Sequence, residues 1–175
     1  MVERSDALVL LGATGDLAHR KIYPALLGMV RRGQLDAPVV GVSRSGWHLE
    51  QFRARVKDSL AQRAGDSGSP AAQKLLSLLR YVDGDYQSAE TFGHLKEALK
   101  DSKRPLFYLA IPPSLFAQVV ESIGGSGCGT GARVVLEKPF GRDLLTAQAL
   151  NRTLENVFSE SSIFRIDHFL GKEPV

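Results

Sequence analysis

The chain has 175 residues, which is enough for one globular domain with a substantial core. Its 22 basic and 19 acidic side chains leave a net charge of +3, and 43% of its residues are hydrophobic. This composition excludes disorder over the whole chain, and the lack of any apolar run near ~18 residues excludes a membrane span. The basic side chains form no block of the nucleic-acid-binding kind, so no nucleic acid partner is expected.

Cysteine content and the first residues bear on location. The single cysteine, Cys128, cannot form an internal disulfide or a cysteine zinc site, and no metal is expected. Residues 1–6 are polar and a strand-like run follows at once, which is not a signal-peptide pattern. The expected location is therefore the cytoplasm.

Short apolar runs alternate with amphipathic stretches along the chain. Strands are predicted over residues 7–11, 38–43, 81–82, 106–111, 133–137 and 163–166. Helices are predicted over residues 15–32, 49–63, 71–79, 88–100, 114–123 and 143–158, with Pro24 disturbing the first of them. This alternation predicts an α/β fold: a Rossmann-like, doubly wound, mostly parallel sheet of about six strands. Ligands of such sheets bind beyond the carboxyl ends of the strands.

A glycine turn follows the first strand. Gly12 permits a tight turn, Gly15 lets a phosphate approach the backbone, and Ala18 allows close helix–strand packing. The N–H groups at the helix start and the helix dipole suit a pyrophosphate, although a plain glycine turn is the alternative. The expected cofactor-binding residues here are Gly12, Ala13, Thr14, Gly15, Asp16 and Leu17.

The second strand ends without an acidic residue. An NAD-binding Rossmann domain usually places Asp or Glu there, where the carboxylate bonds the ribose 2′-hydroxyl. This chain has Ser43 and Arg44 instead, a hydroxyl and a guanidinium that suit a 2′-phosphate. The pattern favours NADP over NAD, and a solvent-exposed arginine is the alternative.

The later strand ends carry further candidates. Asp85 and Tyr86 follow the third strand, where the tyrosine could flank an adenine or close an edge of the core. Tyr108 lies near the end of the fourth strand. Lys138 ends the fifth and precedes Pro139, so its backbone is restricted and a cis bond is possible. A fixed cation there could contact both cofactor and substrate.

The last cluster is at the end of the sixth strand. Asp167, His168 and Lys172 fall within six residues, and one helical turn would align the histidine with the lysine. Two such donors would form an anion site, plausible for a substrate phosphate. A histidine without a ligand is the alternative.

Three segments together resemble the N-terminal part of the glucose-6-phosphate dehydrogenase family. Residues 12–18 are similar to that family's glycine turn, and residues 137–143 and 165–173 to its other two signatures, in the family's order and approximate spacing. The resemblance implies an NADP-dependent oxidation of glucose 6-phosphate at C1 to 6-phosphogluconolactone, the first oxidative step of the pentose phosphate pathway. It also implies that full-length members are homo-oligomers.

The resemblance assigns roles to these residues. Residues 12–17 would hold the pyrophosphate and Arg44 the 2′-phosphate, while Asp85, Tyr86 and Tyr108 would line the coenzyme. Lys138 would bridge coenzyme and substrate, and His168 and Lys172 would bind the sugar phosphate. Asp167 matches the aspartate that orients the family's catalytic histidine.

That catalytic histidine has no counterpart here. In the family it lies in a second, larger α+β domain, so residues 1–175 are expected to form the NADP-binding domain, with that larger domain absent. The histidines are His19, His48, His94 and His168, and only the last matches a site position. Hydride removal from a hemiacetal also needs a base. We therefore expect little turnover by this chain alone.

One residue departs from the family pattern, and two other functions are alternatives. Phe169 stands where the family commonly has tyrosine, which puts phosphate affinity in doubt. A non-catalytic NADP-binding module or sensor would not need a sugar-phosphate site, and so fits the Asp167–His168 pair and Lys138 less well. A short-chain dehydrogenase would need a Tyr-x-x-x-Lys pair, and no tyrosine has lysine at that spacing.

Overall fold

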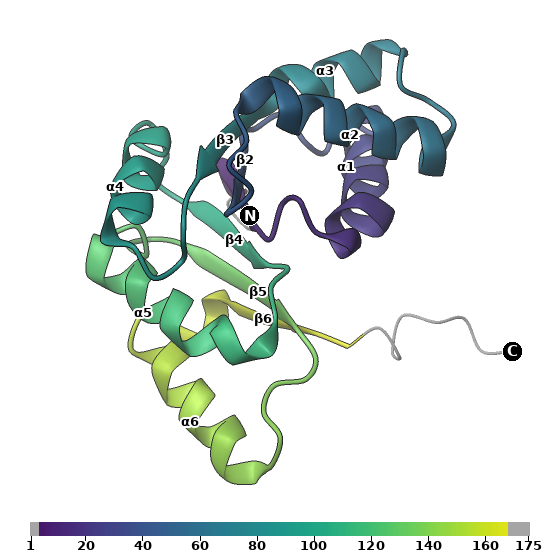
Figure 1. Cartoon of the computed structure of the whole chain (residues 1–175). Helices are drawn as coiled ribbons and strands as arrows, with labels where there is room; N and C mark the ends of the chain where they lie inside the picture. Colours follow the sequence, from purple (N-terminus) through teal and green to yellow (C-terminus); the bar gives the residue numbers. More distant parts are fainter. Residues whose placement is uncertain (1–3, 168–175) are drawn as a thin grey trace, which may run out of the picture.

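Six short segments form the strands of one sheet, and every pair of neighbouring strands runs parallel (Figure 1). The computed structural model describes residues 4–167. The strand order is β3-β2-β1-β4-β5-β6, which confirms the predicted Rossmann-like, doubly wound sheet. The bounds are β1 Ala7–Leu11, β2 Val39–Ser43, β3 Leu79–Asp83, β4 Pro105–Leu109, β5 Arg133–Glu137 and β6 Ile163–Ile166.

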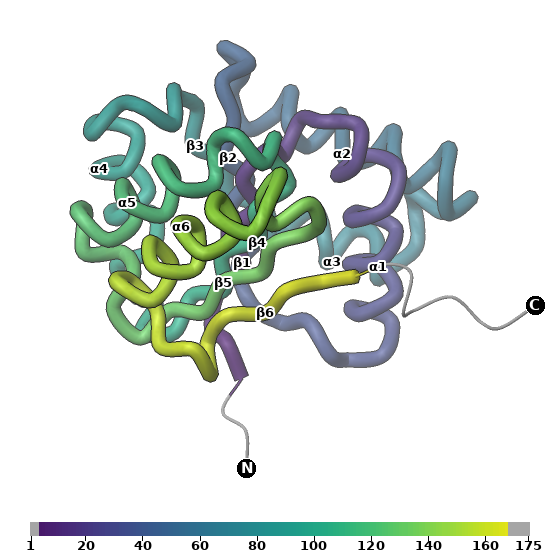
Figure 2. Tube along the Cα trace, turned by 90° about the horizontal axis from the view of Figure 1, so that it is seen from below, coloured from purple at the N-terminus to yellow at the C-terminus, as the bar shows by residue number. Residues whose placement is uncertain are grey.

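Helices cover both faces of this sheet. Helices α1, α2 and α3 pack together on one side, and α4, α5 and α6 on the other, as the two views show (Figures 1 and 2). The helical bounds are η1 Ala18–Ile22, α1 Tyr23–Arg31, α2 Leu49–Ala64, α3 Pro70–Leu78, α4 Ala89–Ala98, η2 Pro113–Leu115, α5 Phe116–Ser126, α6 Leu144–Glu155 and η3 Glu160–Ser162.

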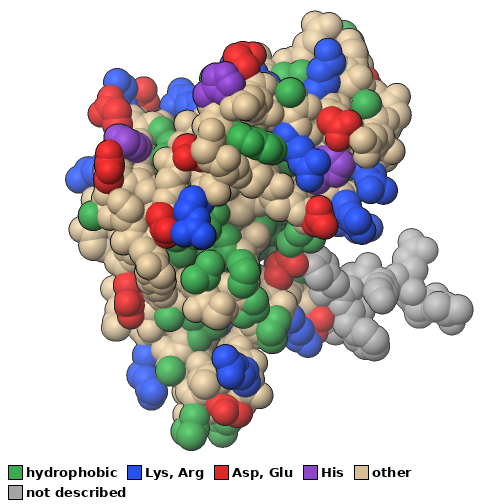
Figure 3. All heavy atoms as spheres, in the orientation of Figure 1, with side chains coloured by type: hydrophobic (Ala, Val, Ile, Leu, Met, Phe, Trp, Pro, Cys, Tyr) green, Lys and Arg blue, Asp and Glu red, His purple; other side chains and the backbone are tan. Residues whose placement is uncertain are grey.

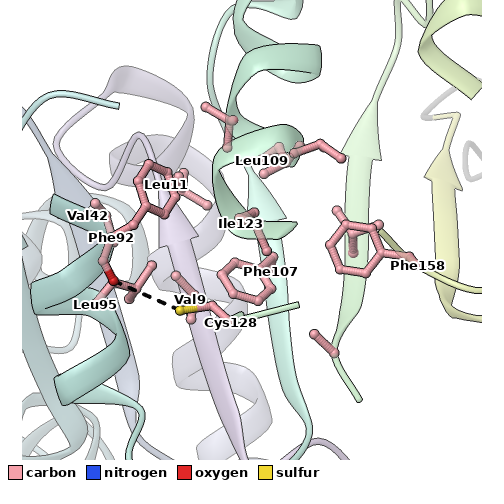
Figure 4. Packing of buried hydrophobic residues seen from close by; sticks show 14 of the residues in the cluster. Val9, Leu11, Val42, Phe92, Leu95, Phe107, Leu109, Ile123, Cys128 and Phe158 are labelled. Atoms are coloured by element: carbon pink, nitrogen blue, oxygen red, sulfur yellow. Dashed lines mark hydrogen bonds between the residues drawn. The ribbon is translucent and has the colours of Figure 1, made fainter. Parts of the chain in front are cut away.

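Strand β1 divides the core because its side chains alternate between the two faces. Leu8 and Leu10 pack with the helices α1–α3, whereas Val9 and Leu11 pack with α4–α6. Figure 4 shows the second of these clusters. In it the ring centroids of Phe107 of β4 and Phe158 lie 6.5 Å apart. A strand buried on both faces reads as a continuous apolar run, which is why the sequence identified β1 with its observed bounds.

The first helix shows how Pro24 disturbs the backbone ladder. A π-helical segment, η1, precedes α1, and the N–H of Tyr23 donates to the Ala18 carbonyl five residues back. Proline cannot donate and clashes with an ordinary α-helical partner, so a wider turn relieves the conflict. The predicted disturbance is confirmed, and the sequence did not predict its form, a π-helical turn.

The other helix ends differ from the predicted ranges by a few residues. Helix α5 runs on to Ser126, within the glycine-rich stretch predicted as a link, and ends at Gly127 with φ 77°. Helix α6 begins after Asp143, whose carboxylate accepts the Thr146 N–H at 2.8 Å. No helix in residues 4–167 is both long and apolar enough to cross a membrane.

Two phenylalanines give a matched test of the packing. Phe107 is fully buried and Phe164 is 46% exposed. We expect Phe107→Ala to lower the free energy of unfolding by about 3–5 kcal/mol, because it leaves a cavity in the core. Phe164→Ala should cost about 1 kcal/mol, since only part of that ring leaves water on folding. Urea denaturation measures both, and equal losses would contradict the assigned core.

Candidate functional site

The sheet topology selects one edge for ligand binding. Strand β1 leads to α1 on one side of the sheet and the neighbouring β4 leads to α5 on the other, so their connections diverge. Such a divergence opens a crevice beyond the carboxyl ends of the strands. A cavity of about 290 Å³ lies there, and its lining includes Leu17, Ile111, Pro112, Glu137 and Lys138.

Larger hollows lie elsewhere on the surface. One of about 770 Å³ lies at the opposite edge, against the amino ends of β1, β2 and β4. Another of about 800 Å³ lies between the start of α5 and residues 139–153, which lead into α6 and run along it. The face in Figure 3, drawn as in Figure 1, has hydrophobic side chains near its centre and charged ones of both signs around them. The site is therefore assigned by topology and residue chemistry, and not by cavity size.

Hydrogen bonds from Gly12 to the adjacent strand end and to Tyr86 fix the glycine turn. The Gly12 N–H donates to the Val42 carbonyl at 3.0 Å and to the Tyr86 hydroxyl at 2.8 Å. Gly12 has φ +84°, and a Cβ there would lie 2.1 Å from the Ala110 carbonyl oxygen. No residue other than glycine fits this turn without moving the end of β4.

The outer side of the turn fits a phosphate group. The Ala13 and Gly15 N–H groups are engaged, to the Val42 and Gly12 carbonyls. Donors to an anion would therefore come from Thr14 and from Asp16 and Leu17, whose N–H groups precede the first intrahelical bonds. A Cβ on Gly15 would meet only the Gly12 oxygen, at 3.2 Å, so the approach to this backbone is open.

The remaining residues of the turn divide between interior and surface. Ala13 and Ala18 are fully buried, and the Tyr23 hydroxyl donates to the Ala13 carbonyl. The Asp16 carboxylate is 81% exposed and lies 3.9 Å from the Arg55 guanidinium. Close helix–strand packing at Ala18, predicted from the sequence, is confirmed.

Arg44 and Asp85, both predicted to contact the coenzyme, lie together. Arg44 Nη1 is 2.6 Å from Asp85 Oδ2, and the arginine side chain is 74% exposed. Hydrogen bonds from the Gln87 N–H and from Arg44 lower the pKa of the Asp85 carboxyl. The guanidinium is accessible at the end of β2, where its other N–H groups can meet an anion.

Ser43 and Ser45 occupy different environments. Ser43 is 4% exposed, and its hydroxyl lies 2.8 Å from the Tyr81 hydroxyl and 3.2 Å from that of Ser45. Ser45 Oγ is 2.8 Å from Thr14 Oγ1, so it reaches the glycine turn. Of the two hydroxyls, that of Ser45 is closer to the open side of the site.

Sequence reasoning did not single out Asp83, Tyr81 or Ser45. Asp83 Oδ1 accepts the N–H groups of the loop after β2, and Tyr81 donates to the same oxygen at 3.0 Å. For Asp83, the available sequence signal was an acidic residue at the carboxyl end of the strand that pairs with β2.

Tyr86 packs at the edge of the core, which was one of its two predicted positions. Its hydroxyl accepts the Gly12 N–H and donates to the Val42 carbonyl at 3.1 Å. Burial raises the pKa of Tyr86 to about 12, and the Gly12 hydrogen bond only partly offsets this. The phenol therefore stays protonated and braces the glycine turn.

A second ion pair joins the fifth and sixth strand ends. Lys138 Nζ lies 2.5 Å from Asp167 Oδ2, although the two residues belong to separate sequence segments. The Lys138–Pro139 bond is cis, as the sequence allowed. Tyr108 donates to Glu137, and burial followed by this hydrogen bond raises the pKa of the tyrosine. His168 and Lys172 lie outside the described residues.

The described histidines lie away from this cavity. His19 is 5% exposed and bonds Asp58 at 2.9 Å, His48 contacts Gln51 at the start of α2, and His94 lies on α4. None of the three lines the cavity beside Lys138. Within residues 4–167, no group of three or more His, Cys, Asp or Glu side chains could hold a metal ion.

Residues 9–175 match the family described as "Glucose-6-phosphate dehydrogenase, NAD binding domain". The chain belongs to the glucose-6-phosphate dehydrogenase family. It is 37% identical to glucose-6-phosphate 1-dehydrogenase 6, cytoplasmic, of Arabidopsis thaliana, over 97% of this chain and 36% of the relative. It is 39% identical to glucose-6-phosphate 1-dehydrogenase 1 of Mycobacterium tuberculosis, over 98% of this chain and 36% of the relative.

Solved structures of the family share the fold. The crystal structure of glucose-6-phosphate 1-dehydrogenase from Mycobacterium avium superposes with a TM-score of 0.90 at 39% identity, covering 98% of this chain and 38% of that one. A glucose-6-phosphate dehydrogenase in complex with glucose 6-phosphate gives 0.84 at 37% identity, covering 99% of this chain and 39% of that one. The chain thus spans little more than a third of the length of these relatives.

The glycine turn can be tested by stability alone. We expect Gly12→Ala to lower the free energy of unfolding by about 3 kcal/mol or more, because both the positive φ and the overlap with Ala110 oppose a methyl group. Gly33 is the matched control: its φ is +66° and nothing lies within 4 Å of the added Cβ. Gly33→Ala should cost about 1 kcal/mol. Similar losses in chemical denaturation would show that the Ala110 contact does not restrict the turn.

Proposed function

We propose that residues 1–175 form the NADP-binding domain of an enzyme that oxidises glucose 6-phosphate at C1. The products would be 6-phosphogluconolactone and NADPH, as in the first oxidative step of the pentose phosphate pathway. The observation that carries this proposal is the meeting of Lys138 with Asp167 beside the crevice that the glycine turn also borders. One cation there lies within reach of both a coenzyme and its substrate. We further propose a cytoplasmic protein whose full-length form is a homo-oligomer.

NADP is preferred because of the charges at the end of β2. The strand ends in Ser43 and Arg44, and neither side chain repels a 2′-phosphate. Arg44 is exposed and its one carboxylate contact is to Asp85, an exposed pair of the kind that contributes little to stability. A phosphate dianion can replace or share that contact. NADP, when bound, accepts a hydride from the substrate.

This chain's own residues would bind and orient the reactants. Thr14, Asp16 and Leu17 would donate backbone N–H groups to the pyrophosphate, and Tyr108 would line the coenzyme. Lys138 would neutralise charge between coenzyme and sugar. His168 and Lys172 would bind the sugar phosphate, and Asp167 would hold the imidazole of a catalytic base in position.

Hydride loss from C1 also requires a base that takes the hydroxyl proton. His19, His48 and His94 lie away from the cavity, and His168 is assigned to the sugar phosphate. Carboxylates in the crevice are engaged as well, since Asp167 pairs with Lys138 and Glu137 accepts from Tyr108. The proposal is therefore binding of NADP with little or no turnover by residues 1–175 alone.

Arg44→Ala tests coenzyme choice. It should raise the Kd for NADP by about tenfold, the value of one exposed charge-assisted contact, and should hardly change the Kd for NAD. Titration calorimetry with each coenzyme measures both constants. Arg63→Ala, an exposed arginine in the last turn of α2, is the control and should change neither. Equal weakening of both coenzymes would show that Arg44 does not read the 2′-phosphate.

Turnover tests the missing base. With NADP and glucose 6-phosphate, the chain should form no NADPH above background, although calorimetry detects NADP binding. The binding measurement ensures that silence in the assay comes from absent chemistry and not from unfolded protein. Robust NADPH formation would overturn the proposal that a base is missing.

A further inference from the structure

A single carboxylate oxygen holds the loop that carries Arg44. Asp83, the last residue of β3, accepts three successive backbone N–H groups through Oδ1. The donors are Ser45 at 3.0 Å, Gly46 at 2.9 Å and Trp47 at 3.4 Å. Strand β3 pairs with β2 so that Asp83 lies opposite Ser43, which places the carboxylate beneath this loop. Asp83 therefore fixes the backbone that immediately follows Arg44.

The same oxygen also ends a chain of hydroxyl groups. Tyr81 donates to it at 3.0 Å, and the Tyr81 hydroxyl lies 2.8 Å from Ser43 Oγ. Ser43 is 3.2 Å from Ser45 Oγ, which is 2.8 Å from Thr14 Oγ1. The chain runs from the end of β3, through the Arg44 loop, to the glycine turn. It thus links the residues proposed for the 2′-phosphate with those proposed for the pyrophosphate.

The carboxylate sets the direction of this chain. An ionised carboxylate only accepts, so the Tyr81 proton points to Asp83 and the Ser43 proton points to Tyr81. Ser43 then has no proton left for a ligand, and in its link to Ser45 the Ser45 hydroxyl is the donor. Thr14 in turn donates to Ser45, so a ligand takes the Ser45 or Thr14 proton only by replacing one of these links. Partial burial raises the pKa of the Asp83 carboxyl, but the four hydrogen bonds to it together outweigh this and lower the pKa.

The platform beneath these groups is rigid. Tyr81 stacks on Phe52 of α2 with ring centroids 5.0 Å apart, and Phe52 is fully buried. Gly41 of β2 has no side chain to displace that ring, since a Cβ there would lie 2.5 Å from it. The Asp83 carboxylate is thus connected to the core through Tyr81, and it holds the loop through the loop's backbone N–H groups.

We infer that Asp83 is a positioning residue for coenzyme choice: it holds the 44–47 loop in the conformation that presents Arg44 and Ser45 to a 2′-phosphate. This inference rests on the proposed function. Asp83 itself is committed to the loop backbone and does not contact the nucleotide. Its removal leaves the side chains of Arg44 and Ser45 in place chemically but releases the loop, so only a fraction of molecules keeps the binding geometry.

Coenzyme titrations of the full chain test this role. Asp83→Ala should raise the Kd for NADP about tenfold, if a tenth of the molecules keeps the binding-competent loop, and the Kd for NAD should change by less than about twofold. Asp83→Asn keeps an oxygen acceptor at the same place and should recover much of the NADP affinity. Asp66→Ala is the matched control, because Asp66 also anchors a loop, through the Ser69 N–H at 3.0 Å and Arg31 at 2.5 Å. It should leave both constants unchanged.

A second readout needs no coenzyme. Trp47 is the single tryptophan of the chain and lies in the loop, so its fluorescence reports on loop order. Acrylamide should quench Trp47 more strongly in Asp83→Ala than in the unmodified chain, and equally in Asp66→Ala and the unmodified chain. An unchanged NADP to NAD ratio, or unchanged quenching, in Asp83→Ala would overturn the inference.

The two readouts also separate this inference from the proposed function. If the unmodified chain binds NADP no better than NAD, the proposed NADP preference fails, and with it the role of Asp83 in coenzyme choice. The quenching measurement would then still decide whether Asp83 orders the loop.

Discussion

The turn at Gly12 is the point on which the rest of the site depends. Its N–H reaches the Val42 carbonyl at the end of β2 and the Tyr86 hydroxyl from the segment after β3. Its α-carbon has no room for a side chain against the Ala110 carbonyl, just beyond β4. The end of the central strand is therefore in contact with the ends of its neighbours on both sides. The ends of β2 and β4 and the segment after β3 are thus positioned relative to one backbone turn.

Because this backbone turn positions the site, few charged side chains are needed around it. Arg44, proposed for the 2′-phosphate, and Lys138, proposed to bridge coenzyme and substrate, each pair with a carboxylate, Asp85 and Asp167 respectively. The Arg44–Asp85 pair is exposed, and such pairs contribute little to stability, whereas the Asp167 side chain of the second pair is only 24% exposed. Both pairs keep a long basic side chain near the crevice, and an incoming phosphate can compete for the same guanidinium or ammonium group. The backbone turn therefore fixes the site, and the ion pairs orient the Arg44 and Lys138 side chains.

How far the sequence predicts this site follows from what kind of interaction holds each part. Strands β1 and β5 were located closely because buried parallel strands are nearly continuous apolar runs. Predicted candidates such as Arg44 and Lys138 stand directly after such runs. Tyr86 could not be placed, because its partner Gly12 is 74 residues away and only the tertiary fold brings them together. Asp83 was missed for the same reason: its partners belong to the loop after a different strand.

The position of the acidic residues at this edge gives a physical account of the proposed preference for NADP. A carboxylate at the end of β2 would accept a hydrogen bond from a ribose 2′-hydroxyl and repel a 2′-phosphate. Here the nearest acids, Asp83 and Asp85, belong to β3 and the segment after it, one strand further out. Asp83 is occupied by three backbone N–H groups and Asp85 by Arg44. Both negative charges thus contact the loop that carries Arg44, and under the proposed function they help to present a cation where an NAD-binding domain has an acid.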